Sequence, residues 1–498
     1  MNNEEIMGCD TLSVLVLERN VGADANTEYT LPEYLPEIRK LLHVEQTVIP
    51  PAKYVNSSSA QMNGTVDYRV LYVGADGGLY TAPVSAEYRV NIPIDMQDFI
   101  DSSEGLEMMC SVCGESVNPR ATGPRRISIR SRLKCTVRVI GKVRLCESML
   151  GEVNLMSIYK RRESCLTAEY CSSCSDIFET EYEISPLSEG MRIADADAKV
   201  FVDSVSMGDG RISCRGDVMF RALGIDENSG ELMKVSKKLP FESEIELDRE
   251  MPDALVRVRG IPSEVRVEID EDRAICKIGV MIEACCLANR EAEYTADIYS
   301  SERECKTVEQ EYESAQVLLC KNANITLSER LSSEDAGLSA DAEIVEVFAS
   351  AAIDGCKREN DKVIFDGSTK LSVVCVDNGE YLCTDMMLPF RYETDSAFDG
   401  EPSSFSGTAD IVSIRANNDG GNFSVDAELA LGVDCMGKSR ISAVDEVEFG
   451  ETAESEENAL IVCYPSQTDT LWSVAKRYKV APSKISGDPQ VDKYIIIE

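Results

Sequence analysis

The sequence predicts a mainly β protein: three tandem β-sandwich-like repeat units followed by a small C-terminal βααβ domain. Two observations predict this class. Apolar and polar residues alternate with a period of two along many segments, as on strands with one face in a core. A glycine–strand–turn–strand pattern also recurs about every 150 residues, which indicates an internal repeat.

The alternation is clearest in ISIRSRLKCTVRV, residues 127–139, where the odd positions are mostly apolar. The basic side chains, together with Arg126 just before the segment, are those of Arg130, Arg132, Lys134 and Arg138. We interpret them as a solvated strand face that balances acidic neighbours. If this face docks a partner, an acidic protein surface is favoured over nucleic acid, because no aromatic residues are interleaved with the charges.

The repeat is marked by three glycines, each followed by a strand, a turn and a second strand. They are Gly64, Gly216 and Gly367, spaced by 152 and 151 residues. The turns are Asp76-Gly77, Asn228-Ser229-Gly230 and Asn378-Gly379, and such pairs supply the positive φ angles of tight hairpins. An aromatic residue follows each glycine by 24, 25 and 23 residues: Tyr88, Phe241 and Phe390. The chain therefore contains three related β units, each of one or two sandwiches.

These patterns divide the chain into six parts. They are an N-terminal segment 1–28, β units 29–157, 158–297 and 298–444, an acidic linker 445–458 and a small domain 459–498. The second and third units are taken to begin at the matching segments IYKRRESC and IYSSEREC, from Ile158 and Ile298. The linker is assigned because DEVEFGETAESEEN contains seven Asp or Glu residues.

Charge and the N-terminal sequence bear on partners and location. A net charge of −38 argues against nucleic acid or an anionic membrane as a partner, because carboxylates repel phosphates. The segment MNNEEIMGCD has no basic, apolar signal character, and no apolar run approaches the ~18 residues of a spanning helix. We therefore expect a cytoplasmic protein without membrane insertion, in which the 19 cysteines are reduced.

Nothing in the sequence indicates an enzyme. The only histidine is His43, so no cluster of histidines is available for proton transfer or metal binding. Two CxxC pairs, Cys110/Cys113 and Cys171/Cys174, have the local spacing of zinc ligands, but 57 residues lie between them. We expect unlinked thiols, and no catalytic residue, cofactor or metal.

The segment YPSQTDTLWSVAKRYKV, residues 464–480, contains the only tryptophan, Trp472. One apolar stripe of a helix is predicted by the i, i+3, i+4, i+7 spacing of Leu471, Val474, Ala475 and Tyr478. Asp469 or Thr470 is the expected N-cap. ALIVCY before the helix and YIIIE after it predict strands, and Pro482 can begin a second short helix. Strand, helix, helix and strand follow one another within about forty residues, a very small domain.

This segment resembles the LysM module, whose core runs roughly GDTLW-x-I-A-x-x-Y-G-V. LysM modules bind glycans that contain N-acetylglucosamine, such as peptidoglycan, in a shallow groove. The resemblance implies that Thr468, Asp469 and Thr470 form the lip of that groove, with Trp472 and Tyr478 as anchors for a partner or glycan. The departures fall on the groove. Thr468 and Lys479 stand where LysM modules have glycine, and Gly487-Asp488 stands where an Asn-bearing stretch is usual.

The upstream chain carries a second resemblance. LPEYLPEIRKLLHVEQTV, residues 31–48, and GTVDYRVLY, residues 64–72, resemble the opening and the core strand of the SPOCS domain. Tandem SPOCS units followed by a LysM module are the layout of the SipL-like spore coat morphogenetic proteins of spore-forming clostridia. The resemblance implies a mother-cell protein at the forespore surface, whose module contacts the basement-layer ATPase of the coat.

Two functions follow from these observations. The first is a non-enzymatic scaffold for coat assembly, whose module binds the basement-layer ATPase or another spore coat protein. The alternative is a protein that binds peptidoglycan through the module. A hydrolase that uses carboxylates of the body is a third, weakly supported class, since no carboxylate pair stands out from the acidic background.

Overall fold

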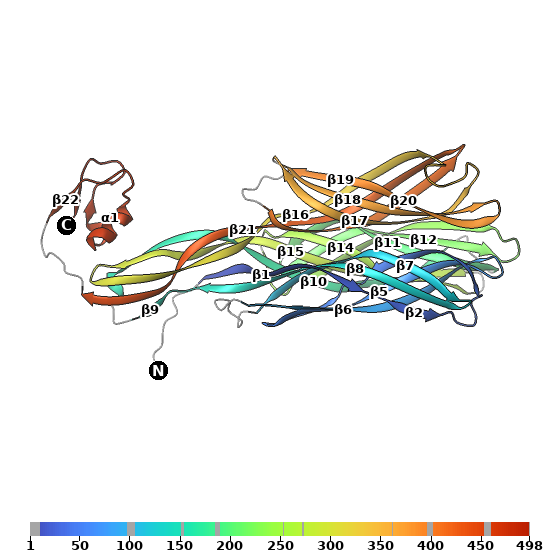
Figure 1. The fold of residues 1–498 in the computed structure, drawn as a ribbon, viewed down its shortest axis with the longest axis horizontal. Coiled ribbons are helices and arrows are strands. Elements are labelled where there is room, and N and C mark those ends of the chain that lie inside the picture. The colour runs from blue at the N-terminus through green and yellow to red at the C-terminus, as the bar shows by residue number, and fades with distance from the viewer. Residues whose placement is uncertain are drawn as a thin grey trace.

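The computed structural model shows three β-sandwiches side by side, a stalk of long strands that extends from them, and a small module at the end of the stalk (Figure 1). It describes residues 10–96, 105–150, 154–184, 190–251, 253–270, 273–360, 362–395, 402–452 and 460–497. The prediction of a mainly β class is confirmed, because nearly all elements are strands. Within these ranges, no helix has the length and apolar character that crossing a membrane requires.

The first sandwich contains two sheets. Its strands are β1 (Asp10–Asp24), β2 (Thr27–Thr30), β3 (Ile38–Val48), β4 (Ala52–Val55), β5 (Ser59–Gly74), β6 (Leu79–Pro93), β7 (Glu107–Gly123) and β8 (Arg126–Leu145). Strands β1, β2, β7 and β8 form one sheet and β3 to β6 form the other. Between this sandwich and the second lie β9 (Ser148–Leu150), which pairs with β21, and the short 3₁₀ helix η1 (Leu155–Ser157).

The second and third sandwiches repeat this order without the short strands. The second has β10 (Ile158–Ile184), β11 (Met191–Gly208), β12 (Arg211–Asp226), β13 (Leu232–Glu246), β14 (Leu255–Asp270) and β15 (Arg273–Ser300). The third has β16 (Arg303–Ser332), β17 (Glu343–Glu359), β18 (Lys362–Asp377), β19 (Glu380–Asp395), β20 (Pro402–Asp419) and β21 (Asn422–Thr452). In each repeat the first strand pairs with the last, as β1–β8, β10–β15 and β16–β21. Each unit is therefore one sandwich, not two.

The repeat glycines form close cross-strand pairs with the repeat aromatics. Gly64 lies opposite Tyr88, and the same pairing joins Gly216 to Phe241 and Gly367 to Phe390. A Cβ atom on Gly64 would lie 2.5 Å from the Tyr88 ring, which leaves no room for a side chain there. The spacing read from the sequence therefore reflects a packing unit, in which each ring lies over a glycine of the neighbouring strand.

The predicted hairpin turns are also confirmed. Gly77, Gly230 and Gly379 have φ angles of 85°, 73° and 78°, in the left-handed region that glycine adopts without strain. In the second and third units the turn joins the second and third strands of a three-stranded sheet, and in the first unit it joins β5 to β6 in a four-stranded sheet.

The prediction that residues 1–28 lie outside the first unit is wrong for the described part of that segment, residues 10–28. Strand β1 pairs with β8 along its length, and its Leu12 is fully buried. Its apolar side chains pack on those of β8 and of the later repeats, so β1 is the first strand of the first sandwich. Similarly, β15 continues to Ser300, so the third sandwich begins at Arg303 and not at residue 298.

The predicted linker 445–458 is also corrected in its first half. Strand β21 continues through Thr452, because Val444, Val447 and Phe449 are buried in a cluster with Ile298. These apolar side chains alternate with the acidic ones. The linker was predicted from the number of acidic residues, and that number does not show the alternation. The rest of the predicted linker, residues 453–458, lies outside the described part of the chain.

The sheets formed by β3–β6, by β11–β13 and by β17–β19 meet around Phe348. The single histidine, His43, stacks on this ring with centroids 4.3 Å apart, and the guanidinium groups of Arg69 and Arg221 lie over it. Both arginines are paired with carboxylates, including Asp197. Burial lowers the pKa of His43 to about 4, so the ring is neutral at physiological pH. His43 is therefore a packing residue of the junction between sandwiches.

The basic face predicted for residues 126–138 needs one correction. Arg126, Arg130 and Arg132 are exposed as expected, but Arg138 is only 1% exposed. Strand β8 enters the centre of the body at this point, so both of its faces are covered. The Arg138 guanidinium pairs there with the fully buried Asp434 of β21.

Candidate interaction site at the C-terminal module

The module is a three-stranded sheet with one helix. Its elements are β22 (Ile461–Cys463), α1 (Leu471–Tyr478), the 3₁₀ helix η2 (Pro482–Lys484), β23 (Ile485–Ser486) and β24 (Ile495–Ile497). Strand β24 is central, with β22 and β23 at its edges. The expected strands and first helix are present, but the second helix expected from Pro482 is a single 3₁₀ turn.

Helix α1 begins and ends through local hydrogen bonds. Of the two residues expected as N-cap, Thr470 has this role: its hydroxyl accepts from the Ser473 amide, and the Ser473 hydroxyl accepts from the Thr470 amide. The helix ends at Lys479, which has a φ of 52°. This left-handed position is where LysM modules have glycine, and here a lysine occupies it.

The module core is very small. The side chains of Val474 and Ala475 are fully buried, together with Cys463 and Ile495. Tyr478 packs at the edge of this cluster, and a hydrogen bond with Cys463 raises the pKa of its phenol. The predicted anchor Tyr478 is therefore part of the module core.

Two residues of the predicted groove lip, Thr468 and Asp469, make hydrogen bonds within the module. Thr468 is exposed and its hydroxyl bonds that of Ser466. Asp469 is buried and accepts from Arg477 and from the Ser466 amide. These hydrogen bonds lower the pKa of Asp469 to about 2. A glycan would find Thr468 accessible, whereas the Asp469 carboxylate already holds the loop to the helix.

Trp472, the other predicted anchor, lies against the stalk. Its indole Nε1 donates to Asp297 Oδ2 at 2.8 Å, and its ring meets Tyr299 edge-on with centroids 5.0 Å apart. Tyr299 is itself stacked on Tyr159 of β10. The face of the helix that carries Trp472 is thus covered by β15, and in this arrangement it does not face an external partner.

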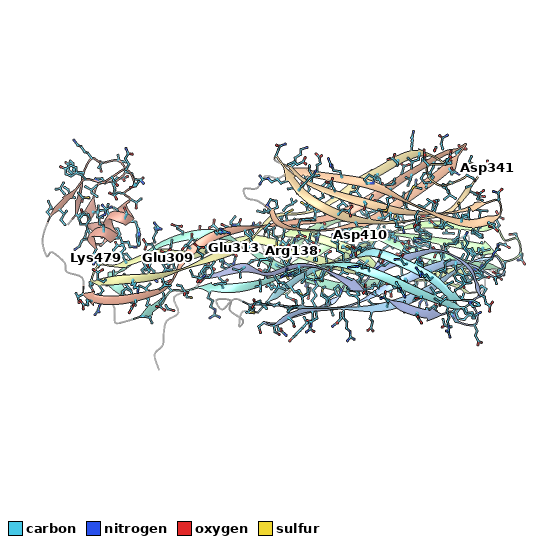
Figure 2. All side chains as sticks on the ribbon, in the orientation of Figure 1. Arg138, Glu309, Glu313, Asp341, Asp410 and Lys479 are labelled. Carbon is cyan, nitrogen blue, oxygen red and sulfur yellow. The ribbon has the colours of Figure 1, made fainter. Side chains whose placement is uncertain are left out.

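Three further contacts surround the tryptophan. Lys476 Nζ donates to Asp297 Oδ1 at 2.6 Å, and the Tyr299 hydroxyl donates to the Val480 carbonyl at 2.7 Å. Lys479 pairs with Glu304, on the side of the module that faces the stalk (Figure 2). The module is therefore attached by a compact set of polar contacts from β15 and β16.

Asp297 is the centre of this attachment. Partial burial acts to raise the pKa of its carboxyl, but the bonds from Lys476 and Trp472 lower it overall. Asp297 is consequently ionised at physiological pH and accepts both bonds. Sequence patterns did not reveal this role, because Asp297 is 175 residues from Trp472 and is one of many acidic residues on strands.

The opposite face of the module is exposed and apolar. Alternation along β22 and β24 places Val462, Tyr464, Tyr494 and Ile496 on the side of the sheet away from α1. Tyr464 is 71% exposed and Tyr494 is 53% exposed, with ring centroids 6.4 Å apart. We call these four residues the outer sheet face. An exposed apolar group of this kind on a small domain marks a contact surface.

The body contains no cluster of metal-binding side chains among the residues that the structure describes. No group of three or more His, Cys, Asp or Glu side chains there has the geometry of a metal site. Cys110, Cys113 and Cys171 are free thiols, and burial raises the pKa of each, which makes them poor nucleophiles. The side chain of Cys174 lies outside the described residues. Contrary to the expectation of wholly reduced cysteines, Cys146 is in a disulfide.

In comparisons with known proteins, no protein-family model, curated protein or solved structure matches this chain. The SPOCS and LysM resemblances therefore rest on the quoted segments alone.

Proposed function

We propose that this chain is a non-enzymatic assembly protein of the spore coat. Three sandwiches of the SPOCS type serve as its scaffold, and a LysM-like module at the end of the stalk binds a coat basement-layer protein, the ATPase, at the forespore surface. The observation that carries this proposal is the outer sheet face, an exposed apolar surface held away from the body by a long stalk (Figure 1).

Because Trp472 is attached to the stalk, we assign the partner to a different face of the module from the one that the LysM resemblance implies. A LysM-type groove would use the loop at residues 468–470 and the start of α1, but Trp472 and Lys476 are engaged with Asp297. The outer sheet face makes no such contact with the residues that the structure describes. We therefore assign the partner to Tyr464 and Tyr494, because rigid, half-exposed aromatic side chains contribute most to binding at protein interfaces.

The proposal is tested by measuring binding of the purified full chain to a purified basement-layer ATPase. Replacing Tyr464 and Tyr494 together by serine is expected to weaken binding about a thousand-fold, since such anchors each contribute about 2 kcal/mol. Tyr34→Ser is the matched control, because Tyr34 is 84% exposed but lies in the first sandwich. Unchanged affinity in the double variant would refute the assigned surface.

The glycan alternative makes a different prediction. Binding to peptidoglycan would depend on the exposed loop at Thr468, and would survive the loss of Tyr464 and Tyr494. A pull-down of the full chain by purified peptidoglycan, compared between the Thr468→Trp variant and the Tyr464/Tyr494 double variant, separates the two. Loss of peptidoglycan binding only in the Thr468 variant would replace coat assembly by glycan binding as the function.

Localisation tests the cellular part of the proposal. A fluorescent fusion of the full chain is expected to appear only in the mother cell and to surround the forespore. Uniform fluorescence during vegetative growth would contradict a role in coat assembly, whatever the module binds.

A further inference from the structure

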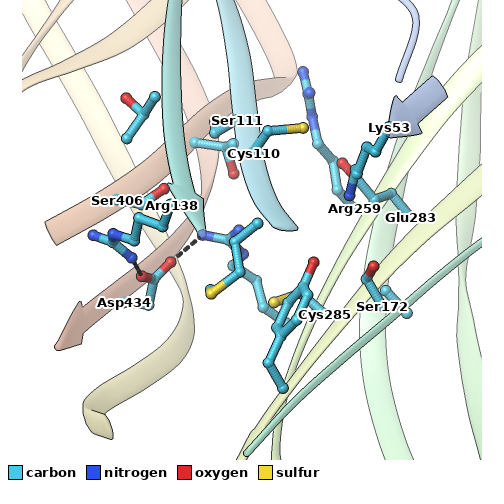
Figure 3. Close-up of a pocket in the computed structure, with 16 residues that line it drawn as sticks. Lys53, Cys110, Ser111, Arg138, Ser172, Arg259, Glu283, Cys285, Ser406 and Asp434 are labelled. Carbon is cyan, nitrogen blue, oxygen red and sulfur yellow. Dashed lines mark hydrogen bonds and ion pairs between the residues drawn. The ribbon is translucent and has the colours of Figure 1, made fainter. Parts of the chain in front are cut away.

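The three sandwiches meet around a polar pocket inside the body. The pocket is partly open to solvent and has a volume of about 30 Å³ for small molecules to occupy. Figure 3 shows its lining side chains, which come from all three units. The first sandwich contributes β4, β7 and β8, the second β10, β14 and β15, and the third β20 and β21. This pocket is separate from the module and from the function proposed above.

Equivalent positions of the three repeat units meet in this pocket. Arg138, Cys285 and Asp434 each lie twelve residues after the first residue of β8, β15 and β21. All three line the pocket. One repeat thus supplies a cation, one a thiol and one an anion at the same position, so the pocket is polar and asymmetric where the sandwich cores are apolar.

Positive charge is in excess among the lining side chains. Four cations line the pocket, Lys53, Arg138, Arg257 and Arg259, against the two carboxylates Glu283 and Asp434. The whole chain, in contrast, has a net charge of −38. Some of this charge is neutralised from outside the lining, since Arg259 makes two bonds to Asp410 and Arg138 Nε bonds Glu18.

One carboxylate is shared by two arginines. Arg138 Nη1 lies 2.5 Å from Asp434 Oδ1, and Arg257 Nη1 lies 2.6 Å from Asp434 Oδ2. Burial acts to lower the pKa of Arg257, but the Asp434 carboxylate raises it overall, so this guanidinium stays charged. Asp434 thus holds both guanidinium groups at the pocket wall, while Glu18 supplies a second carboxylate to Arg138.

Arg138 has an unused donor in the pocket wall. Its Nη2 is buried and makes no hydrogen bond, although its other two nitrogens are paired. A buried charged donor without an acceptor costs free energy. Lys53 lies across the pocket from Arg138 (Figure 3), and it makes no hydrogen bond or ion pair with any residue that the structure describes. Hydroxyl groups of Ser111, Ser406 and Thr408 complete the lining with neutral donors.

We propose that this pocket binds a small oxyanion, no larger than phosphate. Arg138 Nη2 donates to its oxygens, the Arg257 guanidinium and the lining hydroxyls surround it, and Lys53 adds positive charge from across the pocket. Planar guanidinium groups are the preferred protein ligands of such anions. Because the lining comes from three sandwiches, the bound anion holds them together and stabilises the whole body.

The experiment compares the full chain in phosphate and in chloride of equal ionic strength. Phosphate is expected to raise the midpoint of thermal unfolding more than chloride does, since a ligand that binds only the folded state stabilises it. Titration calorimetry with inorganic phosphate is expected to show about one site per chain. Parallel titrations with sulfate and acetate show whether the pocket selects tetrahedral or carboxylate oxyanions, and binding of either class supports the proposal.

Lys53→Gln is the informative variant, because it removes a pocket cation without breaking the Arg138–Asp434–Arg257 network. It is expected to weaken phosphate binding about three-fold, because a positive charge is lost from the pocket without the loss of a direct hydrogen bond. Lys321→Gln, the same change on an exposed residue of β16, is expected to leave binding unchanged. Equal stabilisation by phosphate and chloride, or equal phosphate binding in the two variants, would overturn the proposal in favour of a pocket filled by water.

Discussion

The junction inside the body and the attachment of the module are both ionic, yet they differ in burial. At the junction, Asp434 is fully buried between Arg138 and Arg257. At the module, Asp297 accepts from Trp472 and from Lys476, whose side chain is 43% exposed. A buried pair cannot separate without leaving a charge in the interior, whereas an exposed pair exchanges its partner for water at little cost.

The comparison teaches which parts of the molecule separate. The three sandwiches form one body, because their contacts include buried charges and shared apolar clusters such as the one around Phe348. The module is joined by a few bonds at its surface and keeps its own core. We expect the body to unfold as a unit, and the module to leave the stalk without unfolding.

The largest effect is expected from breaking the buried junction. Asp434→Ala leaves Arg138 and Arg257 without their shared carboxylate and is expected to destabilise the body by about 3–5 kcal/mol. Urea unfolding measures this loss. Asp426→Ala, an exposed position of the same strand β21, serves as the control and is expected to cost less than about 0.5 kcal/mol. Similar losses in the two variants would mean that burial does not set the strength of the junction.

The pH dependence of the body is expected to depend on His43. Its pKa is about 4 in the folded chain and 6.5 without burial, so the unfolded chain binds the extra proton between these values. The stabilising contribution of the neutral ring is complete above pH 6.5 and is lost as the pH falls toward 4, on the order of 2 kcal/mol.

His43→Gln removes this pH-dependent contribution. The midpoint of unfolding is therefore expected to fall less between pH 6.5 and pH 4.5 than in the unmodified chain. Burial raises the pKa of the neighbouring Asp195 to about 6, which acts in the opposite direction but is present in both proteins. Parallel pH profiles for the two proteins would show that His43 does not titrate with unfolding.

The module is expected to respond to loss of its cap. Thr470→Ala removes the hydroxyl that accepts from the Ser473 amide, at a cost of about 1 kcal/mol to helix α1. Amide hydrogen exchange should increase in residues 471–478 and stay unchanged in β21. Equal changes in both places would show that module and body unfold together, contrary to the comparison.

Breaking the attachment of the module to the stalk is expected to have the smallest effect on stability and the largest effect on the position of the module. Asp297→Ala removes the acceptor of Trp472 and Lys476 and is expected to cost the body less than about 1 kcal/mol. Because Trp472 is the only tryptophan, its emission reports the change directly: release from Tyr299 into water should shift it to longer wavelength. Asp341→Ala, an acidic residue far from the module (Figure 2), is the control. An unshifted spectrum would mean that the other contacts suffice to hold the module.

Local patterns predicted the parts of the fold that local chemistry determines. The Gly64–Tyr88 pair, the hairpin turns and helix α1 could be predicted, since their residues are neighbours in sequence or recur at a fixed spacing. The roles of Arg138 and Trp472 were not. Alternation identifies the inner face of a strand but not whether its outer face is covered by another sandwich, and no pattern near Trp472 indicates a partner 175 residues earlier.

Strand β1 has a consequence for how the protein is made. Its Val14 pairs with Gly141 of β8 on one side and with Ser314 of β16 on the other. A ribosome therefore releases this strand long before its second neighbour exists, and its free edge is open to mispairing during that interval. Conditions that slow translation of the first two sandwiches should favour aggregation, and a nascent chain that stops before β16 should need a chaperone to stay in solution.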